Sequence, residues 1–494
     1  MRLALIFNPF KYKVHEENLR IVQKYFGMFP PLSLAWVASI AREAGHDVTL
    51  IDARTLKLSK KEVLNRLQEF KPEILGFMMT TYMFPETLEW IRYLKNALHL
   101  PVVVGGYNLR IYPAESVSHA EIDYGVVEHA IDTIPQLLSA LEGYGRLEDV
   151  VGLVYKDKGK IRINPPGPVD FEKFPLPARD LLPNELYFEF PTERMNFTVM
   201  VTSLGCPHNC AFCEAGGTAY NPRSPETVVN EMEECYRKYG IREIDIFDYD
   251  FTIDRKRVVA ICREMRKRNL NILWACRSRI DIDRDLLREM KAAGCGRIYY
   301  GIESGSQEIL DRINKGITLD QIRETIRHTR ELGIKALGFF LIGAPGETKK
   351  TVRQTVKFAK KLNLEYVQFS KCLAKPLSPL WKEMVAKTGK DYWKEWVLGK
   401  EKDTCLPRPW TELTNKEVER LTKWAYVSYH SQFSFLFKSA LNVRSFPEFK
   451  RKLSAYIDML FSQEKTSKMD DNFIAYHEKR KNAAKTESKG LSAP

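Results

Sequence analysis

The chemistry of this chain is most visible in the segment CPHNCAFC, which holds Cys206, Cys210 and Cys213. Grouped thiols in a reducing compartment bind metal more often than they pair as disulfides. A structural zinc site needs four protein ligands, and no fourth Cys or His stands at a suitable spacing, although His208 lies inside the loop. A four-iron cluster on three thiolates would keep one iron open for a substrate or cosubstrate. The segment therefore predicts a metal centre.

The rest of the composition predicts a cytoplasmic globular protein. Of 494 residues, 44% are hydrophobic and 28% are charged, which is ordinary for soluble domains. No run approaches the ~20 apolar residues of a membrane-spanning helix, and MRLALIFNPF predicts a first strand rather than a signal peptide. The net charge is +13, but Lys and Arg are scattered among acidic residues along predicted helices, which is typical of solvated faces. No nucleic-acid motif is present, so we expect no nucleic-acid partner.

The elements that must position the cysteines alternate between strand and helix over most of the chain. Residues 1–145 predict a Rossmann-like, doubly wound parallel sheet, because apolar runs of strand length are separated by helix-length segments. Ligands bind outside the carboxyl ends of such strands. We therefore expect a ligand at the polar and small residues that follow these runs: Asn8, Pro9, Thr80, Thr81, Gly105 and Gly106.

A second alternating region follows a connector. Residues 146–192 contain a predicted β-hairpin around Lys158-Gly159 and a proline-dense stretch that neither a helix nor a central strand tolerates. Residues 193–395 alternate in the same way and predict a partial (β/α)6 barrel, with its site at the carboxyl ends of the strands. Residues 396–462 are expected to be helical, and residues 463–494 to form a polar, disordered tail. The predicted fold class is thus α/β with a helical C-terminal region.

Segments of the barrel region resemble the radical S-adenosylmethionine (SAM) superfamily. They are the C-x3-C-x2-C loop after the first barrel strand, YYGIES at the end of the fourth, and GFFLIGAPGET at the end of the fifth. The resemblance implies that Cys206, Cys210 and Cys213 hold a 4Fe–4S cluster whose open iron binds SAM, and that cleavage of SAM gives a 5′-deoxyadenosyl radical. It also implies SAM contacts at Phe212, Glu303, Ser304, Gly343 and Glu347.

Other residues at the strand ends are candidates for the same site. The superfamily's usual Gly-Gly-Glu is replaced here by FDYDF, which makes Asp248 and Asp250 candidate acceptors for the SAM ammonium group. Arg277 and Arg279 are candidates for the SAM carboxylate or for an acidic group of the substrate. The alternative is that these charges are simply solvated. Cys372, after the sixth barrel strand, is a candidate for a chemical role, and we expect most of the remaining cysteines to be small buried residues: Cys235, Cys262, Cys276, Cys295 and Cys405.

The first domain resembles the cobalamin-binding domain fused ahead of many radical SAM enzymes, through FPPLSLAWVASIAREAGHDVTLIDA, VVVGGYN and EIDYGVV. The connector FPLPARDLLP and the later PLSPLW resemble that fused family too, which implies cobalamin as a cofactor. The family's D-x-H-x-x-G motif is missing, since NPFKYKVHEEN offers His15 alone, so we expect no protein His on cobalt. Glu128, His129 and Ala130 replace a Gly-Glu-Gly-Glu run, and the alternative is a degenerate Rossmann-like domain kept for packing or substrate shape.

The family includes hopanoid and bacteriochlorophyllide methylases and the anaerobic magnesium-protoporphyrin monomethyl ester cyclase. The resemblance thus implies methylation of an unactivated carbon on a hydrophobic substrate, either a tetrapyrrole such as a bacteriochlorophyllide or a polycyclic or isoprenoid lipid. Alternatives are radical cyclisation or oxidation without methyl transfer, and an iron–sulfur electron carrier or sensor. We expect an electron donor such as flavodoxin or ferredoxin. The aromatic and basic segment from Trp424 to Phe461 predicts helices packed on the barrel; a wall for an apolar substrate, or an interfacial helix at a membrane, is the alternative.

Overall fold

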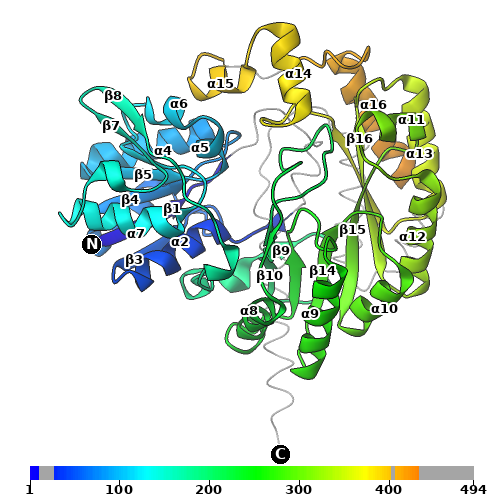
Figure 1. The fold of residues 1–494 in the computed structure, drawn as a ribbon, viewed down its shortest axis with the longest axis horizontal. Helices are drawn as coiled ribbons and strands as arrows, with labels where there is room; N and C mark the ends of the chain where they lie inside the picture. Colours follow the sequence, from blue (N-terminus) through cyan, green and yellow to red (C-terminus); the bar gives the residue numbers. More distant parts are fainter. Residues whose placement is uncertain (11–26, 402–405, 433–494) are drawn as a thin grey trace, which may run out of the picture.

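The computed structural model describes residues 1–10, 27–401 and 406–432. One sheet lies in a first lobe at the N-terminus, and a second, curled sheet forms the barrel (Figure 1). The predictions for His15, Cys405, residues 433–462 and the tail 463–494 lie outside the described residues. Among the described helices, none is both long and apolar enough to cross a bilayer.

The first lobe is a doubly wound sheet with the strand order β3-β1-β4-β5-β6-β7-β8. Its parallel strands are β1 (Arg2–Phe7), β3 (Asp47–Asp52), β4 (Ile74–Met78), β5 (Val102–Gly105) and β6 (Tyr124–Val126). The chain starts in the middle at β1, places β3 on one side and adds β4 to β6 on the other. The topological switch point, where such sheets bind ligands, therefore lies between β1 and β4.

Helices cover both faces of this sheet, because successive residues of a strand point to opposite faces. Leu3 and Leu5 of β1 pack with α2 (Leu32–Glu43) and α7 (Ala130–Leu141). Ala4 and Ile6 belong to the cluster on the other face, which is covered by α3 (Lys60–Phe70), α4 (Phe84–Leu98), α5 (Tyr107–Ile111) and α6 (Pro113–Val117). The near-continuous apolar runs of the strands are explained by this double burial.

The predicted hairpin around Lys158-Gly159 is confirmed as β7 (Leu153–Asp157) and β8 (Lys160–Ile163). It does not belong to a free connector, however, because β7 pairs antiparallel with β6 and extends the first sheet. The first lobe thus continues beyond residue 145, to the end of β8. Sequence alone could not place this boundary, since a hairpin pattern does not specify which edge strand it joins.

The remaining connector is built from short 3-10 turns and is anchored to both sides. The turns are Phe171–Lys173, Arg179–Leu181 and Asn184–Leu186, and an earlier one, Leu147–Asp149, precedes the hairpin. Phe171 and Phe174 pack edge-on against Trp36 of α2. Buried Arg179 donates to Glu231 of α8 (Pro225–Arg237) at 2.7 Å. The connector therefore fixes the first lobe to the barrel.

The barrel strands stand in chain order and are all parallel: β10 (Phe197–Met200), β13 (Glu243–Ile246), β14 (Leu273–Ser278), β15 (Cys295–Glu303), β16 (Lys335–Ile342) and β17 (Tyr366–Lys371). Helices α8, α9 (Arg255–Lys267), α10 (Arg284–Ala292), α11 (Gln307–Arg312), α12 (Leu319–Glu331) and α13 (Lys349–Leu362) lie on its outer side (Figure 1). The predicted partial barrel is confirmed. Two-residue strands add small ribbons: β2 (Gly27–Met28) with β9 (Phe188–Glu189), and β11 (Ser203–Leu204) with β12 (Asn221–Pro222).

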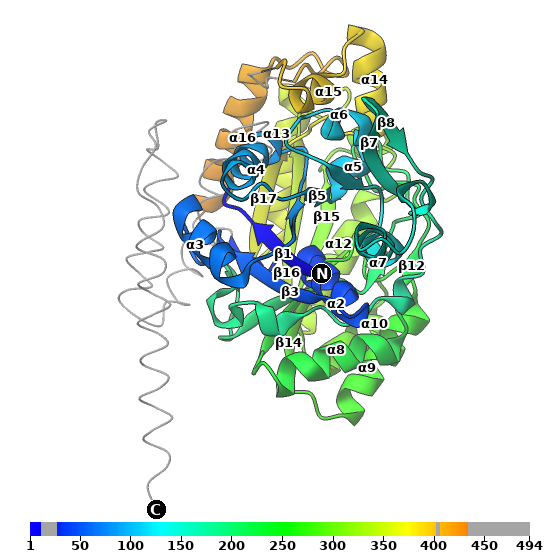
Figure 2. The ribbon, with the colours of Figure 1, turned by 90° about the vertical axis from the view of Figure 1, so that its left-hand side faces the viewer.

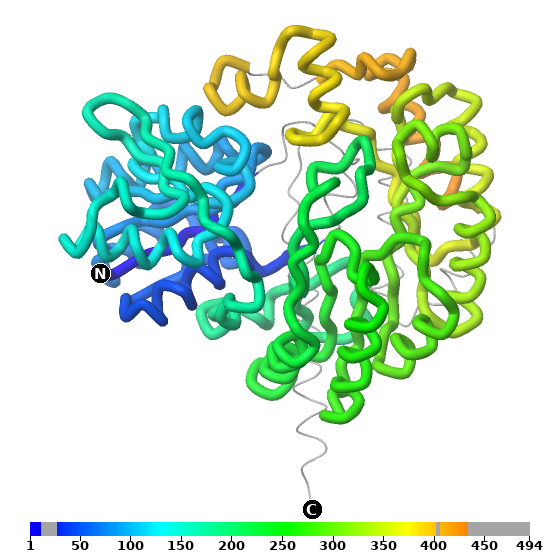
Figure 3. Tube along the Cα trace, in the orientation of Figure 1, coloured from blue at the N-terminus to red at the C-terminus, as the bar shows by residue number. Residues whose placement is uncertain are grey.

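Helices that follow β17 form an arch from the barrel back to the first lobe (Figure 3). They are α14 (Pro379–Thr388) and α15 (Tyr392–Val397), and α16 (Asn415–His430) then packs on β17 and α13. The Trp396 indole donates to the carbonyl of Thr81 at 3.0 Å, and the Tyr112 hydroxyl lies 3.0 Å from both carboxylate oxygens of Asp391. Seen from the first lobe, α15 lies beside α6 at the same end of the molecule (Figure 2).

Candidate active site

The three cysteines lie on the loop that follows β10, at the carboxyl end of the barrel. Cys206 and Cys210 are buried and Cys213 is partly buried. The Cys206 amide donates to the Thr218 hydroxyl, and the Thr218 amide returns a bond to the Cys206 carbonyl at 3.0 Å. The Cys213 amide donates to the carbonyl of Cys210 at 3.1 Å. These bonds close the loop, so the three thiols are held by one compact turn.

The three thiols of this loop have the donor chemistry of an iron–sulfur cluster. Within the described part of the chain, no three His, Cys, Asp or Glu side chains are grouped so that they could hold one metal ion. In a 4Fe–4S cluster each cysteine binds a different iron, so its ligands stand further apart than around one ion. Three neighbouring thiols at the carboxyl end of the barrel are the donor set that such a cluster would take. Burial raises the pKa of Cys206 and raises that of Cys213 to about 11, so metal binding would displace their protons.

A turn after α11 is hydrogen-bonded to the cysteine loop. The amide of Ala211 donates to the carbonyl of Ile313 at 2.9 Å, and the Asn314 side-chain amide donates to the carbonyl of Asn209 at 2.9 Å. The next residue, Lys315, forms a buried ion pair with Glu303 at 2.9 Å. Sequence reasoning missed this turn. Its signal was the INKG segment, where Asn314 and Gly316 have the positive φ that ends a helix.

Glu303, predicted to contact SAM, lies at the end of β15 in a strained conformation. Its φ is +65°, in the left-handed region that non-glycine residues rarely adopt. A Cβ at Gly301 would lie 2.6 Å from the Glu303 carboxylate and 2.8 Å from Lys315 Nζ, so a larger residue at this position would displace the ion pair from its present place. Lys315 Nζ also lies 5.9 Å from the ring centroid of Phe212. The structure thus brings Glu303 and Phe212 together beside the cysteine loop.

The two aspartates of the FDYDF segment have different surroundings. The carboxylate of Asp248 accepts from the Thr202 amide and hydroxyl and from the Ser203 hydroxyl, at 2.6 to 2.7 Å. It therefore holds the start of the cysteine loop. Asp250 faces His208 inside that loop, with 3.6 Å between Oδ2 and Nε2. Burial opposes its ionisation, but the nearby His208 and the hydrogen bonds from the amide and hydroxyl of Thr252 outweigh burial and lower the pKa of Asp250.

Hydrogen bonds hold the loops that follow β15 and β16, and they involve Ser304, Gly343 and Glu347. The Ser304 hydroxyl pairs with Thr355 of α13 at 3.1 Å. Glu347 accepts from the Gly343 amide at 2.5 Å and from the Ala344 amide at 3.2 Å, which closes the loop after β16. Burial raises the pKa of Glu347 to about 8. Its Oε1 has no hydrogen-bond partner among the described residues.

The other cysteines that the structure describes lie in the packed interior. Cys372 is fully buried directly after β17, and its amide donates to the carbonyl of Ile342 at 2.8 Å. Cys235, Cys262, Cys276 and Cys295 are buried within helices and strands of the barrel, as predicted for small apolar residues.

At the carboxyl end of the first sheet, several predicted ligand residues lie around the switch point. Asn8 is fully buried at the end of β1, and its Oδ1 has no partner in the described parts of the chain. Thr81 donates to Asn108 at 3.0 Å. Gly106 has a φ of +108°, and a Cβ there would approach the carbonyl oxygen of Met79 to 2.9 Å. The backbone of Met79 accounts for the glycine, and the unpaired amide oxygen of Asn8 is the feature here that a ligand such as a corrinoid could engage.

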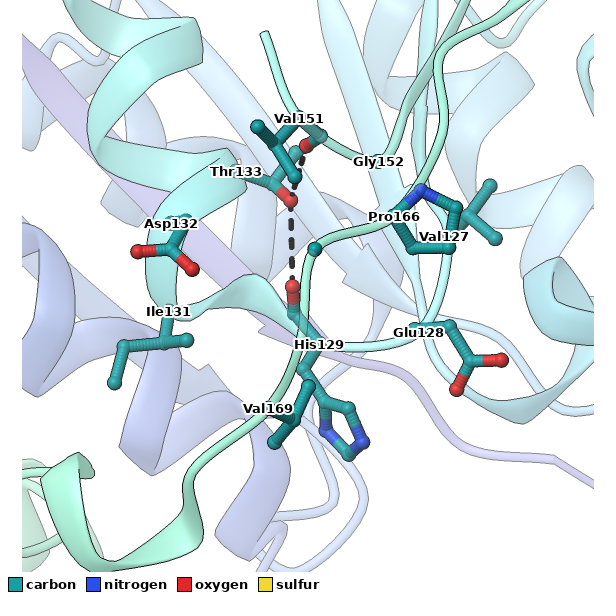
Figure 4. A pocket seen from close by; sticks show the side chains of 11 residues that line it. Val127, Glu128, His129, Ile131, Asp132, Thr133, Val151, Gly152, Pro166 and Val169 are labelled. Carbon is teal, nitrogen blue, oxygen red and sulfur yellow. Dashed lines mark hydrogen bonds between the residues drawn. The ribbon is translucent and has the colours of Figure 1, made fainter.

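The divergent VVEHAID segment lines a small pocket at the start of α7 (Figure 4). The Thr133 hydroxyl donates to the carbonyl of Val151 at 2.7 Å, with the carbonyl of His129 as a second acceptor at 3.3 Å (Figure 4). The His129 ring packs edge-on against Phe174 of the connector, and burial lowers its pKa. His129 thus takes part in lobe packing.

A hydrogen bond joins the segment after β5, at the carboxyl end of the first sheet, to the cysteine loop after β10, at the carboxyl end of the barrel. The hydroxyl of Tyr107, which follows Gly106, donates to the carbonyl of Glu214, which follows Cys213, at 3.2 Å. Tyr249 lies between the two aspartates in the sequence and is 49% exposed. Partial burial raises the pKa of its phenol, as do the nearby Glu214 and Cys213. The positive charges of Lys375 and Arg110 act in the opposite direction and lower this pKa. Sequence reasoning missed both tyrosines, because aromatic residues after strands more often belong to the core.

The barrel interior combines aromatic rings with buried charged groups. Tyr299 and Phe339 stack with centroids 5.7 Å apart, and the Arg277 guanidinium lies 3.6 Å from the centroid of Phe247. Beneath them, the Tyr299 hydroxyl donates to buried Glu189 at 2.9 Å. Burial, with Asp245 nearby, raises the pKa of Glu189 to about 8. The interior therefore offers an apolar, aromatic wall with a cation at its edge.

Comparison with known proteins gave matches in both lobes. The family described as the radical SAM superfamily matches residues 200–359, and the one described as the B12 binding domain matches residues 20–138. The chain is 32% identical to an uncharacterized methyltransferase, PH0819, of Pyrococcus horikoshii, over 84% of this chain and 91% of that protein. It is 28% identical to an anaerobic magnesium-protoporphyrin IX monomethyl ester cyclase of Rubrivivax gelatinosus, over 72% of this chain and 67% of that protein.

A solved structure shares the fold over most of the chain. It is the radical SAM methyltransferase TsrM of Kitasatospora setae, with cobalamin and a 4Fe–4S cluster bound. The TM-score is 0.62 at 21% identity, and the match covers 78% of this chain and 75% of that one.

Proposed function

Since this chain belongs to the cobalamin-binding radical SAM enzymes, we propose that it methylates an unactivated carbon of a hydrophobic substrate. The observation that carries the proposal is the contact between Tyr107 and Glu214, because it joins the corrinoid end of the first sheet to the cysteine loop. A methyl donor and a radical source must both reach one substrate carbon. The near full-length similarity to a methyltransferase supports methyl transfer over other outcomes.

Together the three cofactors supply a 5′-deoxyadenosyl radical and a methyl group, and the chain's own residues position them. We propose that the three cysteines hold the cluster and that Asp250, rather than the fully engaged Asp248, accepts from the SAM ammonium group. Glu303 and Phe212 lie beside the same loop. The Trp396 indole of the arch bonds to Thr81, and we propose that the arch thereby helps to exclude water from the reacting groups.

For the substrate, we propose an apolar molecule of the tetrapyrrole, polycyclic or isoprenoid class. The aromatic interior formed by Tyr299, Phe339 and Phe247 supports this, because flat or apolar molecules gain most by burial against such walls. Flavodoxin or ferredoxin is the proposed electron donor. Peripheral contact with a membrane would suit an apolar substrate.

Cofactor content tests the proposal through matched variants. Anaerobically reconstituted protein should hold about four irons and also cobalt. Replacing the three cysteines by Ala should remove the iron and leave the cobalt. Gly106→Val should do the reverse, because its side chain would press on Met79 in the first lobe. Loss of both metals in both variants would show unfolding rather than separate sites, and full iron in the cysteine variant would refute the cluster assignment.

A second candidate is radical cyclisation or oxidation without methyl transfer, which the similarity to the cyclase favours. SAM with an isotopically labelled methyl group separates the two. Label in the product means methyl transfer. Formation of 5′-deoxyadenosine with no labelled product would support cyclisation or oxidation.

A further inference from the structure

Arg279 contacts the cysteine loop in a way that its predicted role in SAM binding does not explain. Its side chain follows β14 and is buried, with 8% of the residue exposed. Nη1 lies 3.6 Å from the sulfur of Cys210. Nη2 donates to the carbonyl of Lys315, in the turn that supports the cysteine loop. The same turn therefore fixes both the loop and the arginine.

Among the described residues, no carboxylate forms a hydrogen bond with Arg279. Its Nε is buried and has no hydrogen-bond partner among the described residues. The nearest acidic group, Asp281, is largely exposed and stands 3.8 Å away, too far for a hydrogen bond. A buried guanidinium without an anion is costly. The arrangement therefore points to an anion on the side of Cys210, such as a metal-bound thiolate.

We propose that Arg279 is a positioning residue that donates an N–H to the sulfur of Cys210 and thereby raises the reduction potential of the cluster. The inference rests on the cluster proposed above. Reduction by one electron makes the cluster more negative, so a cation and a hydrogen bond at a ligand sulfur stabilise the reduced form more than the oxidised form. Hydrogen bonds to the sulfurs are a recognised determinant of cluster potential.

The midpoint potential of the reconstituted full chain, measured without SAM by redox titration followed by electron paramagnetic resonance, tests this role. Arg279→Gln should shift the potential to a more negative value. Arg277→Gln is the matched control, because it removes the same charge near the same strand end. Arg277 lies on Phe247 and bonds to Asp245 at 3.0 Å and to the carbonyl of Ile246, so its described hydrogen bonds do not reach a cysteine. Its shift should be clearly smaller.

The outcomes separate this inference from the proposed function. If the wild-type chain binds no iron, the cluster assignment fails. If Arg279→Gln binds as much iron as wild type and its midpoint potential is unchanged, the inference is overturned. Weaker SAM binding in that variant would then assign Arg279 to the SAM carboxylate. If Arg279→Gln loses iron, Arg279→Lys is tested in its place. Lysine keeps the positive charge but lacks the planar guanidinium with its several N–H donors. A potential at or above that of wild type in the Lys variant would also overturn the inference.

Discussion

Glu347→Gln should make this protein more stable at neutral and alkaline pH, and the gain should grow with pH. Glu347 is almost fully buried, its Oε2 accepts from two backbone amides, and its Oε1 has no partner among the described residues. Burial raises its pKa from 4.5 to about 8 even though the two amides oppose the shift. Glutamine keeps an acceptor for both amides and cannot ionise.

The magnitude follows from the linkage between protonation and folding. Below pH 4.5 the carboxyl is protonated in both folded and unfolded chains, and pH has no effect through it. Between 4.5 and about 8 only the unfolded chain releases the proton, so the free energy of unfolding falls by about 1.4 kcal/mol per pH unit. Above pH 8 both states are ionised and the loss is complete.

Urea unfolding of the SAM-free protein at several pH values between 5.5 and 8.5 measures the effect. The difference in unfolding free energy, variant minus wild type, should rise with pH at about that slope. Glu417→Gln is the control: Glu417 is partly exposed and paired with Lys349, which lowers its pKa to about 2, so its contribution is constant above pH 5.5. A difference for Glu347→Gln that stays flat, or falls as pH rises, would show that Glu347 is ionised in the folded protein.

Two substitutions and one spectrum test the site and its supports. Glu303→Ala should weaken SAM binding, measured by calorimetry, with iron content near that of wild type, since Glu303 lies beside the cysteine loop but is not a ligand; unchanged SAM affinity would contradict its proposed role. Glu231→Gln should lower the free energy of unfolding by about 3–5 kcal/mol, because it leaves Arg179 and Arg223 buried without their counter-ion; a loss below 1 kcal/mol in urea unfolding would show that the arginines find other partners. In the cob(II)alamin form, electron paramagnetic resonance should show no nitrogen splitting from a protein imidazole; such splitting would refute the His-free corrinoid site.

The order of the elements and the position of the cysteine loop could be predicted from the amino-acid sequence. Apolar runs of strand length recur between amphipathic segments, and that pattern is local, so the parallel strands of both lobes could be predicted in order. The loop after β10 and the segments after β15 and β16 were likewise recognisable, because a motif of fixed spacing needs no distant contact to be read.

Tertiary structure decided which polar side chain at each strand end faces the site. Asp248 and Asp250 are two residues apart and chemically identical, yet one is engaged by Thr202 and Ser203 and the other faces His208. Their partners come from a loop more than forty residues away, so no local pattern distinguishes them.

The same holds for the arginines and for the support of the loop. Arg277 lies on Phe247 in the barrel interior, whereas Arg279 reaches Cys210. No sequence pattern singles out Lys315 as a functional residue, because its role depends on the ion pair with Glu303 across a turn. Such roles arise from charges and hydrogen-bond partners brought together by folding, since a buried polar group takes whichever distant partner the packed chain presents.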